Sequence, residues 1–195
     1  MFTPDDSFWQ AARALVLALD VPITVANLKF LAAWSYCEKP HEAGQAWQWN
    51  NPWNTTRACC GYIQFENSAG VKRYPTRASG IQATVQSLSL PDYTAIVQAL
   101  HTGTVRALTS SAVLHAIAVW GTSPSCVASD FATISDPPSP YLAPAPAPIV
   151  QRVQQAPVSV LPSVLIALGL LGIGTDVAWV EDQRTGHWFF QRRQS

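Results

Sequence analysis

The sequence predicts a mainly α-helical domain, followed by a Pro/Ala-rich linker and a hydrophobic C-terminal segment. Apolar residues recur at three- and four-residue spacing through most of the first domain, which is typical of amphipathic helices. Proline and alanine dominate from Asp136 onward, as in an extended spacer. The seventeen residues from Val158 to Gly174 then carry no charge. We therefore divide the chain into a helical domain, a linker, a hydrophobic segment and an aromatic, basic tail, at residues 1–134, 135–157, 158–180 and 181–195.

The helical domain is expected to contain several helices in succession. Ser7 is a candidate cap for the first, Thr24 begins the second, and Pro40 stops it. Gly103 ends the fourth, and the "WGT" at 120–122 ends the fifth. Their apolar stripes are Phe8, Ala11, Ala12, Leu15 and Leu19; Leu28, Leu31, Ser35 and Glu38; Ile81, Thr84, Val85 and Leu88; Tyr93, Ile96, Val97 and Leu100; and Leu114, Ile117 and Ala118.

A long segment without helical periodicity, residues 40–78, separates the second and third of these helices. It is rich in Asn, Pro, Gly and aromatic residues. Its strand character is weak and confined to "CGYIQF" and "GVKRYP", so we expect at most a small β-hairpin. Long loops of this kind in compact domains are usually functional.

Composition argues against several classes of function. Charged residues make up 12% of the chain and the net charge is zero, so no basic surface for nucleic acid is expected. Lys72, Arg73 and Arg77 are interpreted as an ordinary solvated cluster. The four histidines are scattered and no glycine-rich phosphate loop is present, so we expect no metal and no cofactor.

The four cysteines leave two interpretations open. An even number permits a disulfide such as Cys60 to Cys126. Alternatively, Cys37, Cys59, Cys60 and Cys126 are small thiols, buried or half exposed.

Glu38 is the candidate catalytic residue. It continues the apolar stripe of the second helix and lies at the end of that helix. Apolar surroundings and the negative end of the helix dipole both disfavour a carboxylate, so the group would hold a proton near neutral pH and could act as a general acid. The alternative is a glutamate turned to solvent at a frayed helix end.

The loop after Glu38 favours the first interpretation. Trp47, Trp49 and Trp53 alternate with the amides Gln48, Asn50, Asn51 and Asn54. Sugars have apolar faces and many hydroxyls, so flat aromatics and planar amides are suited to bind them. One or two of these tryptophans would also fit a buried core position.

The order of motifs resembles the lysozyme-like domains of phage lysins, phage tail-associated proteins and some bacterial wall-acting proteins. The resemblance covers about residues 5 to 122. The segments that carry it are, in order, "AAWSYCE", "NNPWNTT", "ENSAGVKRYP", "SGIQATVQSL", "YTAIVQALHTG" and "VLHAIAVWGT". It implies a lysozyme-like helical fold and an activity on the peptidoglycan glycan backbone.

The resemblance also implies roles for individual residues. Glu38 would be the catalytic acid, and the polymer would lie across the loop from 47 to 74. "GYIQF" is similar to a strand of lytic transglycosylases that faces the acid, which makes Gln64 a candidate for substrate contact. The full set of candidate substrate-binding residues is Trp49, Trp53, Asn54, Thr55, Thr56, Gln64, Asn67 and Tyr74.

The second carboxylate used by most glycosidases is not evident. Glu66 and Glu42 are candidates, or Glu38 acts alone with help from the substrate's own acetamido or hydroxyl group. Two other functions stay open: a non-catalytic wall-binding or virion structural module, and a peptidase or amidase that uses Cys37 or Cys59 with His41 or His115.

The tail suggests how the domain is presented. Residues 158–174 are a candidate membrane span at the lower limit of length; the alternative is a helix buried against a partner protein or a neighbouring subunit. We expect no signal peptide, because Asp5 and Asp6 precede the first apolar run. Association with a membrane or a virion, with action on the cell wall, is the localisation that fits both expectations.

Overall fold

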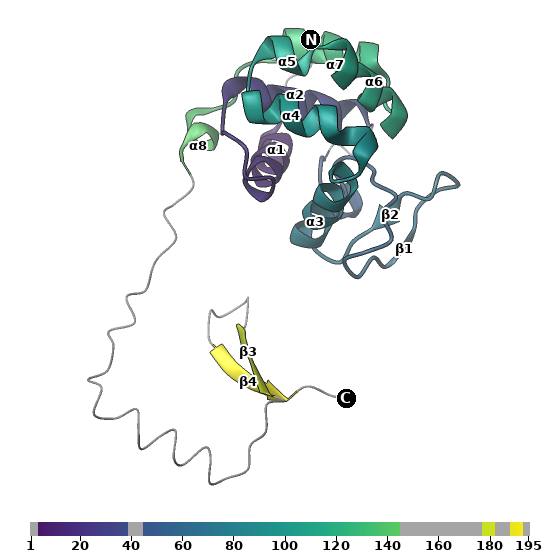
Figure 1. The fold of residues 1–195 in the computed structure, drawn as a ribbon, viewed down its shortest axis with the longest axis vertical. Coiled ribbons are helices and arrows are strands. Elements are labelled where there is room, and N and C mark those ends of the chain that lie inside the picture. The colour runs from purple at the N-terminus through teal and green to yellow at the C-terminus, as the bar shows by residue number, and fades with distance from the viewer. Residues whose placement is uncertain (1–3, 39–44, 145–176, 182–187, 193–195) are drawn as a thin grey trace, which may run out of the picture. The chain divides into compact units, whose positions relative to one another are not determined.

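The structure, a computed structural model, describes residues 4–38, 45–144, 177–181 and 188–192. These residues are mainly helical, which confirms the mainly α-helical class predicted from the sequence (Figure 1). The chain divides into two compact units, Met1–Ala145 and Pro146–Ser195. The helices of the first unit are α1 Asp6–Ala18, α2 Val25–Cys37, α3 Arg77–Leu88, α4 Thr94–Thr102, α5 Val105–Leu108, α6 Ser111–Trp120, α7 Pro124–Thr133 and α8 Ser139–Leu142, with 3₁₀ turns η2 Gln48–Asn50 and η3 Pro91–Tyr93.

Helix α2 is the central element of the first unit. Thr24 caps it as predicted, because its hydroxyl accepts a hydrogen bond from the amide of Asn27 at 3.0 Å. Nearly every side chain from Asn27 to Ser35 is buried, so α2 is apolar around most of its circumference rather than on one face. It contacts α1, α5 and α7. Glu38 follows as the C-cap and stands at the edge of this core.

Helix α1 covers one side of α2 through the stripe that the sequence predicted, including Phe8 and Leu15. The predicted cap was wrong by two residues. Asp5 caps the helix, and its carboxylate accepts from the amide of Ser7 at 2.8 Å and from the Ser7 hydroxyl at 2.6 Å. A carboxylate at a helix N-terminus is favoured by the helix dipole as well as by the hydrogen bond.

The long segment between α2 and α3 contains one small hairpin, as expected. Strands β1 (Gln64–Phe65) and β2 (Lys72–Arg73) pair antiparallel. The loop before the hairpin packs against α3 through a close backbone approach at Gly80. A Cβ at Gly80 would lie 1.6 Å from the carbonyl oxygen of Asn50, so no larger residue fits there without moving the loop.

Helices α4 to α7 follow α3 in the first unit (Figure 1). Helices α5 and α7 contact α2, while α4 and α6 pack against each other. Gly103 and Gly121 end α4 and α6 in the left-handed conformation, as the sequence predicted. Helix α7 was not predicted. It buries only Val127 and Phe131, which is too few apolar positions for a recognisable period.

The cysteine predictions were wrong. Cys37 at the end of α2 is bonded to Cys126 in α7, and Cys59 is bonded to its neighbour Cys60. Cys126 therefore does not pair with Cys60, and no described cysteine is a free thiol. The contact between α2 and α7 explains the pairing, because it brings together two cysteines that lie 89 residues apart in the chain.

The second unit is described only in part. Strand β3 (Val177–Glu181) pairs antiparallel with β4 (Trp188–Arg192), with Trp179 opposite Phe190. Most of the hydrophobic segment 158–180 lies outside the described residues. Among the helices that are described, none has the length and apolar character needed to cross a bilayer. The expected linker, 135–157, overlaps the first unit, since α8 lies within it.

Candidate functional site

Glu38 is held by side chains from three parts of the first unit. The indole N–H of Trp34, one turn earlier in α2, donates to Oε1 of Glu38 at 3.1 Å. The hydroxyl of Thr122, just after α6, donates to the same oxygen. The amide of Asn54 donates to the main-chain carbonyl of Glu38 at 2.6 Å. The acid and its backbone are therefore both fixed by neutral donors.

Burial raises the pKa of Glu38 from its ordinary 4.5 to about 7. The hydrogen bonds from Thr122, Trp34 and Asn54 act in the opposite direction, because they stabilise the carboxylate, but they do not offset the loss of water. The position at the negative end of α2 adds to the effect of burial. With its pKa raised into the neutral range, the group can hold a proton near neutral pH and can also release it.

Thr122 owes its position to the end of α6. Gly121 takes a positive φ of 102°, and the amide of Thr122 bonds to the carbonyl of Ile117 at 3.2 Å. The Thr122 hydroxyl also accepts from Trp34 at 3.0 Å, so the three side chains form a closed set of contacts. The Cys37–Cys126 disulfide joins the residue before Glu38 to the first turn of α7, close in sequence to Thr122.

The "NNPWNTT" loop is organised by the buried amide of Asn51. Its Nδ2 donates to the carbonyls of Thr55 and Lys72 at 2.9 and 2.8 Å, and its Oδ1 accepts from the amide of Thr55 at 2.9 Å. Asn50 donates to the carbonyl of Tyr74 at 2.8 Å. Every polar atom of the Asn51 side chain is thus satisfied, as a buried amide requires, and the loop is tied to the β2 strand.

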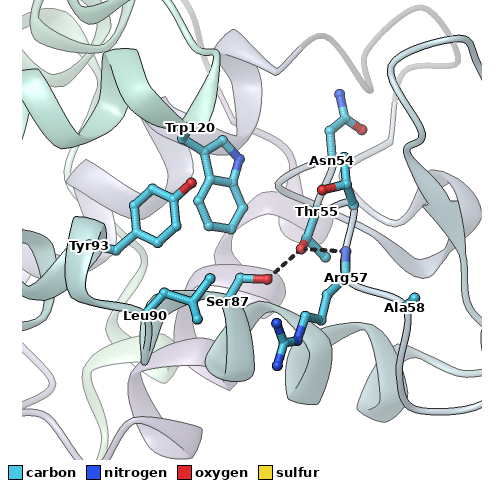
Figure 2. A pocket seen from close by; sticks show the side chains of 9 residues that line it. Asn54, Thr55, Arg57, Ala58, Ser87, Leu90, Tyr93 and Trp120 are labelled. Atoms are coloured by element: carbon cyan, nitrogen blue, oxygen red, sulfur yellow. Dashed lines mark hydrogen bonds between the residues drawn. The ribbon is translucent and has the colours of Figure 1, made fainter.

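A pocket of about 230 Å³ lies between this loop and the helices on the other side (Figure 2). Its volume is below the roughly 300–1,000 Å³ of sites that enclose a whole small molecule, so it suits one part of a larger ligand. Figure 2 shows the loop along one side, Ser87 and Leu90 from the end of α3 below, and the two aromatic rings opposite. The lining residues are Asn54, Thr55, Thr56, Arg57, Ala58, Ser87, Leu90, Tyr93 and Trp120.

Two lining residues connect the pocket to Glu38. Asn54 lines the pocket and bonds to the carbonyl of Glu38. Trp120 lines it as well, and its ring packs edge-on against Trp34 with the centroids 5.0 Å apart. Glu38 itself is not among the lining residues, so its described connection to the pocket runs through Asn54 and Trp120.

The structure brings together only some of the predicted site residues. Asn54, Thr55 and Thr56 line the pocket, and Asn54 contacts Glu38. The Thr55 hydroxyl lies 2.6 Å from that of Ser87, which joins the loop to α3.

The predicted aromatic residues take structural positions. Trp53 and Tyr74 are fully buried; the Trp53 indole donates to the carbonyl of Leu31 at 3.2 Å, and the Tyr74 hydroxyl donates to that of Arg57 at 2.7 Å. Burial raises the pKa of Tyr74 to about 12. Trp49 is half-buried with a positive φ of 56°, and its carbonyl accepts from the amide of Tyr74 at 3.0 Å. The contacts of these residues therefore hold the loop in place, and none of the three lines the pocket.

Gln64 and Asn67 are exposed residues of the hairpin and do not line the pocket. Gln64 donates to Glu66 at 3.2 Å, and the side chain of Asn67 accepts from the amide of Val71 at 3.2 Å. Their described contacts are therefore within the hairpin.

Several residues of the site were not predicted. Trp34 and Thr122 hold the acid, while Ser87, Leu90, Tyr93 and Trp120 complete the pocket. The position of Trp34, four residues before Glu38 on one helix, was a usable signal because residues at this spacing share a face. No sequence spacing indicated that Thr122 would reach the same carboxylate.

The cysteines of the first unit bear on two other kinds of site, a cysteine nucleophile and a metal centre. Cys37, Cys126 and Asp130 lie close enough to share an ion, but both cysteines are in a disulfide and offer no thiolate. Cys59 is likewise bonded, and His41 is outside the described residues. In this disulfide-bonded form neither candidate nucleophile has the free thiol that the reaction needs.

Comparison with known proteins identifies no relative. The chain matches no protein-family model, and neither a curated protein nor a solved structure shows significant similarity to it.

Proposed function

We propose that the first unit is a lysozyme-like domain that cleaves the glycan backbone of peptidoglycan, with Glu38 as general acid and then general base. The proposal rests on the order of sequence motifs and on the surroundings of Glu38. Sugar-cleaving sites need an acid that is protonated near neutral pH beside a polar and aromatic surface.

The observation that carries the proposal is the raised pKa of Glu38, about 7, together with the hydrogen bond that its carbonyl accepts from Asn54, a residue that lines the pocket. A carboxyl that is merely structural is usually paired with a cation, whereas the described donors to Glu38 are an indole, a hydroxyl and an amide. An acid that is shielded from water and has no cation as a partner lowers the stability of the fold, and a catalytic role would explain why the chain keeps it.

In the proposed reaction, neutral Glu38 protonates the glycosidic oxygen as the bond to the anomeric carbon breaks. The resulting carboxylate then removes a proton from the attacking group. If that group is water, the new end is reducing; if it is a hydroxyl of the same sugar, the new end is an anhydro sugar. Trp34 and Thr122 stabilise the carboxylate formed between the two steps.

A second protein carboxylate has no part in this scheme. Glu66 bonds to Arg73 at 3.2 Å and accepts from Gln64, so its charge is already compensated within the hairpin. Glu42 lies outside the described residues. We therefore propose that the substrate's own acetamido or hydroxyl group stabilises the positive charge that develops on the sugar ring.

A non-catalytic wall-binding or virion module is the second candidate. It is favoured by one observation, that Glu38 does not line the pocket. Such a module would use the loop and the two aromatic rings but would not need a protonated acid.

Clearing of purified cell walls by the full chain, beside Glu38→Gln, tests the proposal. We expect a fall in turbidity with the wild type only, and mass analysis of the released fragments then distinguishes reducing from anhydro ends. Sedimentation of both proteins with the walls, without clearing by either, would support the binding module instead.

We also propose that the C-terminal part of the chain attaches the domain to a membrane or a virion. The uncharged run from Val158 to Gly174 supports this, although it lies outside the described residues. Flotation of the full chain with liposomes, beside residues 1–145 alone, tests it. Equal recovery of both proteins in the lipid-free fraction would argue against membrane attachment.

A further inference from the structure

The pocket beside Glu38 contains one charged side chain, Arg57. Its other lining residues are hydroxyl, amide, aromatic and aliphatic, and none is acidic. Arg57 is exposed, and Figure 2 shows its side chain along the lower edge of the pocket. A cavity with a single cation and no acid attracts an anionic ligand and repels a cationic one.

The other arginines of residues 4–38 and 45–144 show what is unusual about Arg57. Arg73 is paired with Glu66 at 3.2 Å, Arg77 bonds to Gln10 and lies over the ring of Trp47, and Arg13 bonds to a main-chain carbonyl. No described carboxylate pairs with Arg57 or Arg106. Of these two, only Arg57 lines a described pocket.

The backbone that carries Arg57 is fixed. Its carbonyl accepts from the buried Tyr74 hydroxyl at 2.7 Å, and its amide donates to the Thr55 hydroxyl at 3.3 Å. The root of the side chain is therefore held in place, while the guanidinium keeps its donors available. A guanidinium presents paired N–H groups that match a carboxylate in two parallel hydrogen bonds.

The remaining surface of the pocket suits a sugar. Tyr93 and Trp120 pack edge-on with their centroids 5.0 Å apart, and Trp120 donates to the carbonyl of Trp53 at 2.8 Å, which fixes the orientation of its ring. Thr55, Thr56 and Ser87 supply hydroxyls. A ligand that satisfies the whole lining has an apolar ring face, hydroxyl groups and one carboxylate.

We propose that Arg57 is a specificity-determining residue that binds a carboxylate on the substituent of the sugar next to the cleaved bond, so that the site prefers an anionic glycan to a neutral one. The effect of Arg57 on cleavage rests on the proposed function, whereas its effect on binding does not require that the chain cleaves the glycan. In peptidoglycan the carboxylate can come from two sources. It is a free lactyl carboxylate in a strand without peptides, or a carboxylate of the attached stem peptide in an intact strand.

The test uses three preparations of glycan strand and the full chain. The first strands have their peptides removed by an amidase and carry free lactyl carboxylates. The second are the same strands with those carboxylates converted to neutral amides, and the third keep their stem peptides. Wild type, Arg57→Gln, Arg57→Lys and Arg106→Gln are compared by kcat/KM, and the three substitutions are also placed in a Glu38→Gln background to measure Kd without cleavage.

We expect neutralising the carboxylate to weaken binding and kcat/KM of the wild type by about tenfold, the effect of losing one charge-assisted pair at a partly exposed site. Arg57→Gln should lose the same factor on charged strands and nothing on neutral ones, with Arg57→Lys between the two. Arg106→Gln, the matched control, should behave as the wild type. The loss caused by Arg57→Gln is compared between peptide-free strands and strands that keep their stem peptides. The preparation with the larger loss identifies the source of the carboxylate.

The outcomes separate this inference from the proposed function. Absence of cleavage with a tenfold charge preference in Kd that depends on Arg57 would overturn the reaction and support the inference. Cleavage of charged and neutral strands at equal rates, or an equal loss on both with Arg57→Gln, would overturn the inference alone. Absence of both cleavage and binding would overturn both.

Discussion

Glu38 and Glu66 are both glutamates of the region that the sequence marks as functional, but their surroundings differ. Glu38 lies at the end of a buried helix, with an indole and a hydroxyl as donors to its carboxyl group, and burial raises its pKa to about 7. Glu66 lies in the hairpin and has the cation of Arg73 as a partner at 3.2 Å. The difference shows that position in a motif does not define an acid; the charges and the water around it do.

Exchanging each glutamate for glutamine gives the largest expected effect. Glu38→Gln should lower the rate of glycan cleavage by about a thousandfold, because glutamine has no proton to give. Glu66→Gln should change the rate by less than about threefold, since Glu66 is paired with Arg73 in the hairpin and does not line the pocket. Release of soluble fragments over time measures both. Comparable losses for the two variants would mean that the hairpin also takes part in the chemistry.

The two disulfides extend the comparison to stability. Cys37–Cys126 joins residues 89 apart and anchors the end of α2, so replacing both cysteines with serine should lower the free energy of unfolding by about 4 kcal/mol. Cys59–Cys60 joins neighbours and closes no loop of chain, so the same change there should have a much smaller effect. Denaturant titrations under non-reducing conditions measure both. Equal destabilisation would show that Cys37–Cys126 does not constrain the unfolded chain as inferred.

Gly80→Ala tests the close packing of the loop that follows Glu38 against α3. The new Cβ would meet the carbonyl oxygen of Asn50, and because that atom belongs to the backbone the loop must move. We expect a loss of about 3 kcal/mol in the free energy of unfolding, against a small gain at an ordinary helix position. Gln82→Ala, at an exposed position of the same helix, is the control. Thermal melts in which both variants match the wild type would contradict the close approach.

Thr122→Val should give a smaller effect, visible in the dependence of activity on pH. In the proposed reaction the protonated form of Glu38 is the acid, so kcat/KM of the wild type should fall as the pH rises through about 7. Removing the Thr122 donor destabilises the carboxylate and raises the pKa of Glu38 further. The alkaline limb should then move to higher pH by less than about one unit, with Thr122→Ser close to the wild type. A shift to lower pH would show that the hydroxyl does not donate to Glu38.

Much of this arrangement could be predicted from the sequence. The helices α1, α2, α3, α4 and α6 could be predicted because each places several apolar residues at helical spacing. Gly103 and Gly121 mark the ends of α4 and α6. Glu38 was found because its own stripe places it beside the core. Helix α7 and the pairing of Cys37 with Cys126 were not visible, since both depend on a contact between segments far apart in the chain.

The roles of the aromatic residues were the least predictable part. Trp53 and Trp49 belong to the same loop as Asn54, yet only Asn54 reaches the pocket. In an irregular loop, the direction of each side chain depends on the local backbone, such as the positive φ of 56° at Trp49 and of 50° at Asn54. Periodicity gives no information there, whereas in a helix it fixes the direction.

The central claim is that Glu38 holds a proton near neutral pH, and a direct titration of its carboxyl group tests it best. The side-chain carboxyl carbon of Glu38 in the full chain can be followed by NMR from pH 3 to pH 9, with Glu38→Gln to assign the signal. We expect a midpoint near 7, well above the ordinary value of 4.5. A midpoint near 4.5 would mean that Glu38 is a carboxylate at neutral pH, and it would contradict the proposed role of Glu38 as the general acid.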